Sequence, residues 1–150
     1  MTAGYHLLEP LGTTTASKLY RTQHLNSGKS TVLKLFDPDN TCAVAPAHFR
    51  HEYTLLQSLH IAGIIQPAAL INEGENLAMA LDALNDFTGE SLEFLLERNP
   101  RLEWPVCVDI ARQLTQTLAG IHAARIIHRD IRPANILVEK ESHRVLLADF

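Results

Sequence analysis

The predominant spacing of apolar residues changes near residues 85–90, and this change constrains the fold more than any other feature. Before it, runs such as STVLKLF at 30–36 combine β-branched and apolar residues between turn residues, as strands do. After it, apolar residues recur at steps of three or four along one side of a long helix: Val106, Ile110, Leu114, Leu118 and Ile121. The sequence therefore predicts a strand-rich first part and a helical second part.

The first part is predicted to contain strands on both sides of a single helix. The strands are expected over residues 5–12, 17–24, 30–36, 68–72 and 77–84. Asn26-Ser27-Gly28 favours a turn between the second and third strands, and Pro46 suits the first turn of the helix. The second part is predicted to contain a short helix capped by Ser91, a long helix from Pro105, and short strands over 135–139 and 144–148.

The composition excludes several classes of protein. With 150 residues, 46% hydrophobic and 20% charged, the chain resembles one soluble globular domain. A net charge of −4 does not suit nucleic-acid binding, which needs a basic surface. The N-terminus lacks the basic start and apolar core of a signal peptide, and the apolar run IAGIIQPAALI is too short to span a bilayer. We therefore expect a cytoplasmic protein with no nucleic-acid or membrane partner.

The segment IIHRDIRPANILV, residues 126–138, carries the polar residues with the clearest chemistry. Phosphoryl transfer to a hydroxyl needs a carboxylate to orient the attacking oxygen and accept its proton, and oxygen ligands for Mg²⁺. Asp130 and Asn135 are spaced to provide both from one loop, and Asp149 can supply the main carboxylate for the metal. The segment therefore predicts a phosphoryl-transfer site.

These residues resemble the eukaryotic-type serine/threonine protein kinase domain, whose catalytic loop is H-R-D-x-x-x-x-N and whose metal motif begins D-F. His128-Arg129-Asp130, Asn135 and Asp149-Phe150 fit that pattern. The resemblance implies an α+β fold: a five-stranded antiparallel N-lobe with one helix over about 1–86, then the start of a mainly helical C-lobe over 87–150. It also implies ATP and Mg²⁺ as cofactors and a protein as the substrate.

The resemblance assigns a role to each candidate site residue. Asp130 and Arg132 are expected to be catalytic, and Asn135 and Asp149 are expected to bind both the metal and the nucleotide. Lys34 is expected to hold the α and β phosphates and to pair with Glu52, since Glu52 is the only carboxylate between Asp39 and Glu73. The nucleotide is also expected to contact residues of the first strands and of the strand after the catalytic loop: Leu11, Gly12, Leu19, Val32 and Leu137.

The sequence departs from the family pattern in three places. The phosphate-covering loop keeps Gly12 but has Thr14 and Ser17 in place of two glycines, so we expect weaker phosphate binding. Arg132 replaces the usual lysine, which exchanges a point charge for a planar fork. The chain also stops at Phe150 in mid-pattern, so we expect a fragment that is inactive by itself.

The phrase DFTGESL, residues 86–92, resembles a subgroup of bacterial kinases. In that subgroup, the kinase domain lies at the N-terminus of a large signalling protein with ATPase and histidine-kinase modules. The resemblance therefore implies that such modules follow in the parent chain.

Three other functions fit parts of the sequence. The lost glycines and Arg132 suit a regulatory module that binds ATP without transferring phosphate. A small-molecule kinase of the aminoglycoside type would share the loop Asp, Asn and later Asp, although Arg129 and Pro133 fit protein kinases better. Gly28-Lys29-Ser30-Thr31 resembles the end of a P-loop, but that motif needs glycine where Gln23 stands and a helix where a strand is predicted.

Overall fold

The computed structural model describes residues 4–13, 17–37, 46–73, 76–81 and 87–150. The chain forms two compact units. The first unit comprises Met1–Ser58 and Gln66–Asp86, and the second comprises Leu59–Ile65 and Phe87–Phe150. The sequence did not predict that residues 59–65 would pack with the second unit.

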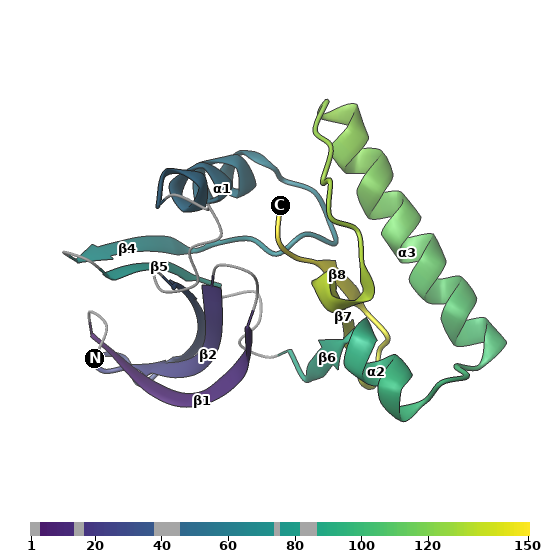
Figure 1. Ribbon diagram of the computed structural model, residues 1–150, viewed down its shortest axis with the longest axis horizontal. Helices are drawn as coiled ribbons and strands as arrows, with labels where there is room; N and C mark the ends of the chain where they lie inside the picture. The colour runs from purple at the N-terminus through teal and green to yellow at the C-terminus, as the bar shows by residue number, and fades with distance from the viewer. Residues whose placement is uncertain (1–3, 14–16, 38–45, 74–75, 82–86) are drawn as a thin grey trace. The chain divides into compact units, whose positions relative to one another are not determined.

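The first unit is built on a five-stranded antiparallel sheet in the order β1-β2-β3-β5-β4 (Figure 1). Its strands are β1 (Tyr5–Thr13), β2 (Ser17–His24), β3 (Ser30–Phe36), β4 (Ala69–Glu73) and β5 (Asn76–Ala80). Between β2 and β3 the chain turns at Gly28, whose φ of 66° lies in the left-handed region that glycine adopts without strain. The predicted sheet is therefore confirmed.

Helix α1 (Pro46–Ser58) has two buried apolar side chains, Phe49 and Leu56, and Phe49 packs against the sheet. The Phe49 ring meets the Phe36 ring edge to face, with ring centroids 6.0 Å apart. The core of the sheet is formed by β3 and β5, where Leu33 and Met79 are fully buried. This packing fixes α1 over the end of β3 that carries Lys34.

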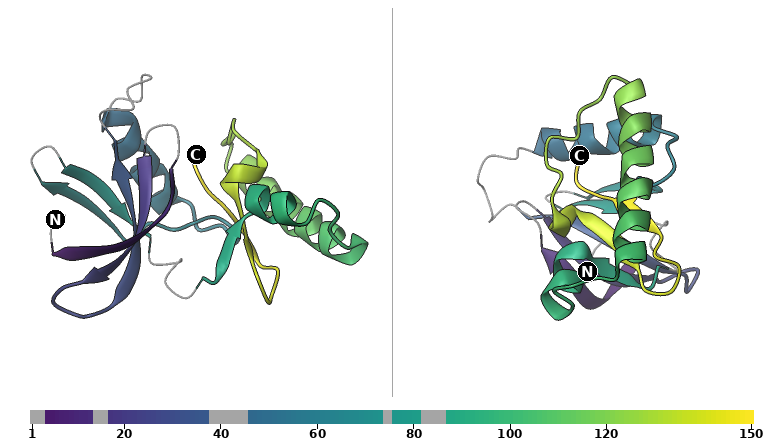
Figure 2. Two further views of the ribbon diagram at one scale, coloured as in Figure 1. Left: turned by 60° about the horizontal axis from the view of Figure 1, so that its bottom comes forward. Right: turned by 90° about the vertical axis from the view of Figure 1, so that its right-hand side faces the viewer.

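The second unit combines two helices with a three-stranded antiparallel sheet in the order β6-β7-β8. Its elements are β6 (Gly89–Ser91), α2 (Leu92–Arg98), α3 (Trp104–Ala123), the 3-10 turn η2 (Pro133–Asn135), β7 (Ile136–Glu139) and β8 (Val145–Leu147). The Ser91 hydroxyl accepts from the Phe94 N–H and caps α2, as predicted. Figure 2 shows α3 running beside the β7–β8 hairpin.

Residues 59–65 join the second unit because they fit closely against α3 and β8. Ile64 forms a parallel bridge with Leu147. Gly63 has a φ of 89°, and a Cβ there would lie 2.0 Å from Thr117 Oγ1. Only glycine allows this approach, and neither contact is visible in local sequence patterns.

The α+β, protein-kinase-like fold predicted from the sequence is confirmed, with differences at the ends of elements. The short strand β6 and the turn η2 were not predicted. Residues 82–84, predicted as the end of a strand, lie outside the described residues. The P-loop alternative is wrong, because Ser30 begins a strand and Lys29 is exposed before it. Within the described part of the chain, no helix is long and apolar enough to cross a membrane.

Candidate active site

Lys34 and Glu52 form a close ion pair in the first unit. Lys34 Nζ donates to both carboxylate oxygens of Glu52, at 2.6 and 2.9 Å. Only 8% and 12% of the two side chains are exposed, and Phe49 lies beside the ammonium group with its centroid 5.8 Å from Nζ. The pair predicted from the sequence thus forms between β3 and α1, inside the unit.

The other candidate residues of the first unit lie on the strands around Lys34. Across the sheet, Gly12 is paired with Leu19 and Leu19 with Lys34, so the three form one row over β1, β2 and β3. Directly paired residues share a face of the sheet, and Val32 lies on that face two residues before Lys34. Val32 is buried, whereas Leu11 on β1 is 40% exposed. Thr14 lies outside the described residues.

The predicted catalytic loop of the second unit, residues 128–135, is organised around the Asn135 side chain. Asn135 Nδ2 donates to the Asp130 backbone carbonyl at 3.0 Å and to Asp130 Oδ2 at 2.8 Å. Asn135 is buried while the Asp130 carboxylate is 58% exposed. Because Nδ2 is committed to Asp130, the amide oxygen of Asn135 is the atom suited to ligate a cation. The sequence placed these two residues in one loop, and the structure brings them into contact.

His128 links the catalytic loop to the segment that carries Asp149. Its Nε2–H donates to the Ala148 carbonyl at 2.9 Å, and Nδ1 accepts from the Asp130 N–H at 3.3 Å. Burial lowers the pKa of His128 below its ordinary value, although the Ala148 carbonyl and the charges of Asp130 and Asp149 oppose this shift. His128 is therefore a neutral ring that joins two backbone segments, and its ring also packs against Phe150.

Asp149 lies two residues after the end of β8 and is held close to Asn135 through the backbone. The Ala148 N–H donates to the Asn135 carbonyl at 2.9 Å, which extends the β7–β8 ladder by one bond. Asp149 and Arg129 have positive φ values of 59° and 71°. Residues other than glycine rarely adopt this conformation, and those that do cluster at functional sites. The structure thus places Asp130, Asn135 and Asp149 at one end of the hairpin.

Arg132 and Leu137 complete the candidate set of the second unit. Arg132 Nε lies 3.9 Å from Asp130 Oδ2, and both side chains are more than half exposed. The planar guanidinium is thereby next to the proposed base, where the sequence placed a cation. Leu137 lies in the middle of β7, paired with Ser91 and Leu146, and is half-buried.

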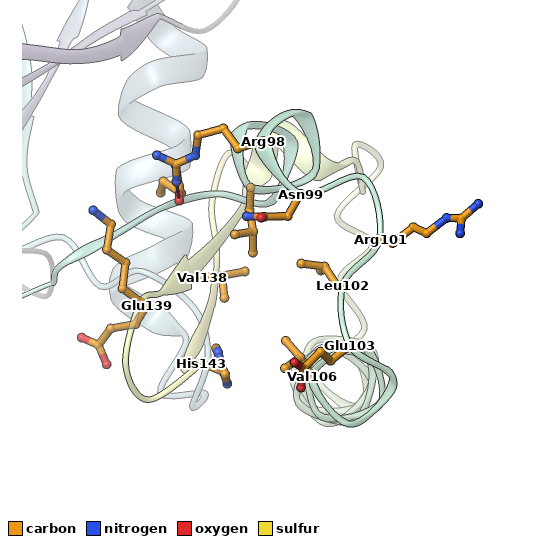
Figure 3. A pocket seen from close by; sticks show the side chains of 12 residues that line it. Arg98, Asn99, Arg101, Leu102, Glu103, Val106, Val138, Glu139 and His143 are labelled. Atoms are coloured by element: carbon orange, nitrogen blue, oxygen red, sulfur yellow. Dashed lines mark hydrogen bonds and ion pairs between the residues drawn. The ribbon is translucent and has the colours of Figure 1, made fainter.

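A pocket of about 430 Å³ lies elsewhere in the second unit (Figure 3). Val138, Leu102 and Val106 line its apolar part, and Arg98 and Glu139 lie on its polar rim. The pocket is near the end of β7, whereas Asn135 precedes the start of that strand. It is therefore separate from the catalytic loop.

Sequence patterns missed the side chain of Gln113, which joins α3 to the β7–β8 hairpin. Gln113 Nε2 donates to the His143 carbonyl at 2.9 Å, and Oε1 accepts from the Val145 N–H at 3.0 Å. The sequence did contain a signal that these polar side chains face the core. Gln113 and Thr117 are one helical turn apart, next to the apolar positions Ile110 and Leu114.

The matched family model has the description "Protein kinase domain" and covers residues 5–150. The chain belongs to the protein kinase domain family. The resemblance seen in the sequence implied three features that the structure contains. They are the α+β fold, the Lys34–Glu52 pair and the loop around Asp130.

Several curated kinases are similar to this kinase domain. "Serine/threonine-protein kinase cds1" of Schizosaccharomyces pombe is 26% identical over 151 residues, covering 97% of this chain and 32% of the relative. "Serine/threonine-protein kinase PkaB" of Streptomyces coelicolor is 31% identical over 111 residues, covering 69% and 26%. "Myosin light chain kinase, smooth muscle" of Gallus gallus is 26% identical over 147 residues, covering 97% and 8%. The chain spans about a third or less of the length of these relatives.

Proposed function

We propose that this chain is the N-terminal portion of a catalytic domain that transfers the γ-phosphoryl group of ATP to a serine or threonine hydroxyl of a protein. The observation that carries the proposal is the pair of hydrogen bonds that Asn135 donates to Asp130, one to the backbone carbonyl and one to the carboxylate. They fix the position of a carboxylate that solvent can reach. Membership of the kinase family and the names of the similar serine/threonine kinases support it.

Asp130 is proposed to act as the base. As the substrate oxygen attacks the γ-phosphorus, its proton passes to the Asp130 carboxylate, and the bond from that phosphorus to the bridging oxygen of ADP breaks. Asn135 orients the carboxylate for this transfer. Arg132, 3.9 Å from Asp130 Oδ2, places a positive charge where negative charge develops on the transferred group.

Lys34 is proposed to hold the α and β phosphates of ATP. Its ammonium group is fixed by both oxygens of Glu52, so little side-chain freedom is lost when a phosphate binds. Leu19, Val32 and Leu137 are proposed to contact the adenine, and Leu11 and Gly12 to lie beside the nucleotide. These apolar and backbone surfaces suit a planar base and its phosphates.

The residues at the end of the β7–β8 hairpin fit a magnesium ion. Asn135 supplies an amide oxygen and Asp149 a carboxylate, which are the hard oxygen ligands that Mg²⁺ prefers. When bound, Mg²⁺ neutralises charge on the β and γ phosphates. The chain itself contributes the fixed spacing of these two ligands, through the Ala148 N–H bond to the Asn135 carbonyl.

We further propose that the domain functions in cytoplasmic bacterial signalling, as part of a parent protein that also carries ATPase and histidine-kinase modules. The phrase DFTGESL at 86–92 supports this context through its resemblance to that subgroup. Detection of such modules in the same polypeptide, by mass spectrometry of the purified native protein, tests it.

The deciding experiment measures phosphoryl transfer from radiolabelled ATP by the full-length protein and its Asp130→Ala variant. Loss of the base is expected to reduce the rate by about 10²–10⁴-fold. Glu97→Ala, which removes an exposed carboxylate on α2, is the matched control and should leave the rate unchanged. Transfer that survives Asp130→Ala would refute the catalytic role, and nucleotide binding without transfer in the wild type would favour a regulatory module.

A further inference from the structure

The chain runs from β8 to Asp149, which lies two residues after the end of the strand. The edge of β8 that faces away from β7 is hydrogen-bonded by groups that local sequence patterns do not connect to this strand. One edge of β8 pairs with β7. On the other edge, the Val145 N–H donates to Gln113 Oε1 at 3.0 Å, and the Leu147 N–H donates to the Gly63 carbonyl at 2.7 Å. Val145 and Leu147 are both buried, so these bonds satisfy donors that water cannot reach.

Gln113 uses its whole amide group in this arrangement. Its Oε1 accepts from Val145, while Nε2 donates to the His143 carbonyl at 2.9 Å and to Asp109 Oδ2 at 2.8 Å. His143 has a positive φ of 53°, so the backbone directly before β8 is in a conformation that needs support. One side chain of α3 therefore fixes both the turn and the first residue of β8.

Thr117 contacts the segment 62–63, which in turn bonds the same edge of β8 at Leu147. It lies one helical turn after Gln113, on the same face of α3. Its hydroxyl lies within hydrogen-bond distance of two carbonyls, that of Ala62 at 3.2 Å and that of Gln113 in the preceding turn at 3.1 Å. The same Oγ1 lies against Gly63, where a Cβ would come within 2.0 Å. The segment that Thr117 holds is the one that bonds Leu147, two residues before Asp149.

We propose that Gln113 and Thr117 are positioning residues for the metal site: through β8 they set where Asp149 lies relative to Asn135. The inference rests on the proposed function, because it takes Asp149 and Asn135 as the metal ligands. A ligand that is free to shift binds a cation more weakly, and residues that orient metal ligands typically contribute about 10–100-fold to affinity.

The test titrates Mn²⁺ into the full-length protein saturated with ADP and follows binding by electron paramagnetic resonance. Gln113→Leu keeps the side-chain size but loses all three hydrogen bonds, and Thr117→Val removes the hydroxyl that lies between the Ala62 and Gln113 carbonyls. We expect Mn²⁺ affinity to fall about tenfold in Gln113→Leu, the lower end of that range, and by less in Thr117→Val. The apparent KM for Mg²⁺ should rise in parallel, while kcat at saturating Mg²⁺ changes little.

Two control variants come from the exposed side of the same helix. Gln116→Leu and Thr115→Val make the same chemical changes at exposed positions, so both should bind Mn²⁺ as the wild type does. Amide hydrogen exchange at Val145 and Leu147 should speed up only in the Gln113 and Thr117 variants.

A purely structural role has a different outcome. If Gln113→Leu and Thr117→Val lower the melting temperature but bind Mn²⁺ with wild-type affinity, the positioning role is refuted. Metal binding is measured without turnover, so a wild type that binds Mn²⁺ but transfers no phosphate counts against the proposed function alone. A wild type without ADP-dependent Mn²⁺ binding overturns both.

Discussion

The two units hold their charged groups in opposite ways. In the first unit, the Lys34 and Glu52 side chains are 8% and 12% exposed and contact each other directly. In the second, Arg132 and Asp130 are 57% and 58% exposed and lie 3.9 Å apart. A buried pair is costly to break because one charge is left in a poor solvent, whereas an exposed pair contributes little to stability.

The comparison separates stability from chemistry. The proposed role of Asp130 requires it to reach a substrate hydroxyl, and its carboxylate is exposed while the buried residues Asn135 and His128 set its position. The proposed role of Lys34 requires a fixed side-chain direction toward phosphate, which burial beside Glu52 provides. Substitutions in the first pair should therefore lower stability as well as nucleotide affinity, and substitutions in the second should act on the reaction with little change in stability.

The largest change in stability is expected for Glu52→Ala. Removing one member of a buried ion pair typically costs about 3–5 kcal/mol, because the desolvated partner keeps its charge. Chemical denaturation measures this loss, with Thr54→Ala at an exposed position of α1 as the control. The double variant Lys34→Met with Glu52→Leu should recover most of the stability but not nucleotide affinity. A Glu52→Ala protein as stable as the wild type would contradict the contrast between the units.

A smaller loss is expected for Asn135→Leu in the catalytic loop. Leucine fills the buried site but leaves the Asp130 carbonyl without the Asn135 donor, which costs about 1–3 kcal/mol. The rate of phosphoryl transfer should fall far more than stability does, since the Asp130 carboxylate also loses its orienting bond. Denaturation and kinetics on one preparation test both, and Asn99→Leu at an exposed position is the control. If Asn135→Leu lowered the rate of phosphoryl transfer by no more than its loss of stability explains, Asn135 would have no role in orienting Asp130 beyond its role in folding.

The pH dependence of stability should carry a contribution from His128. Its pKa in the folded protein lies below the ordinary 6.5, chiefly because it is buried. The unfolded chain then binds more protons than the folded one, so the contribution is complete above pH 6.5 and is lost as pH falls toward the folded pKa. Denaturation measures the free energy of unfolding from pH 8 to pH 5. Its dependence on pH should be about the same for the exposed variant His122→Gln as for the wild type, and shallower for His128→Gln. Parallel curves for all three proteins would show that His128 does not titrate in this way.

The smallest change in stability is expected for Arg132→Ala. An exposed pair contributes at most about 1 kcal/mol, so unfolding should be nearly that of the wild type. Phosphoryl transfer should nevertheless slow, because a cation next to the proposed base is lost. Arg112→Ala on the exposed face of α3 should change neither property. A stability loss as large as that of Glu52→Ala would remove the distinction between the two pairs.

Much of the fold could be predicted because its signals are local. Apolar alternation gave the β2 and β3 boundaries over 17–24 and 30–36, and proline marked the start of α1. The Lys34–Glu52 pair was predictable through the resemblance to protein kinases, which implies a helical glutamate as the partner of Lys34, and Glu52 is the only carboxylate between Asp39 and Glu73. The spacing of His128, Asp130 and Asn135 is likewise local, so the loop was recognised before its geometry was known.

The tertiary structure alone decided how these pieces are held in place. Three sets of contacts join residues that lie 20 to 54 positions apart in the sequence. They are the contact between Gly63 and Thr117, the bonds of Gln113 to β8, and the bond of His128 to Ala148. Helical spacing marks Gln113 and Thr117 as polar residues beside an apolar face, but it does not record which groups they contact, because that depends on which surfaces meet once the helices and strands have formed. The sequence by itself predicted which residues are candidates for the chemistry and determined on which elements they lie. The packing of α3 and residues 59–65 against β8 determined where Asp149 is held, because a strand edge is fixed only by the partner that folding brings to it.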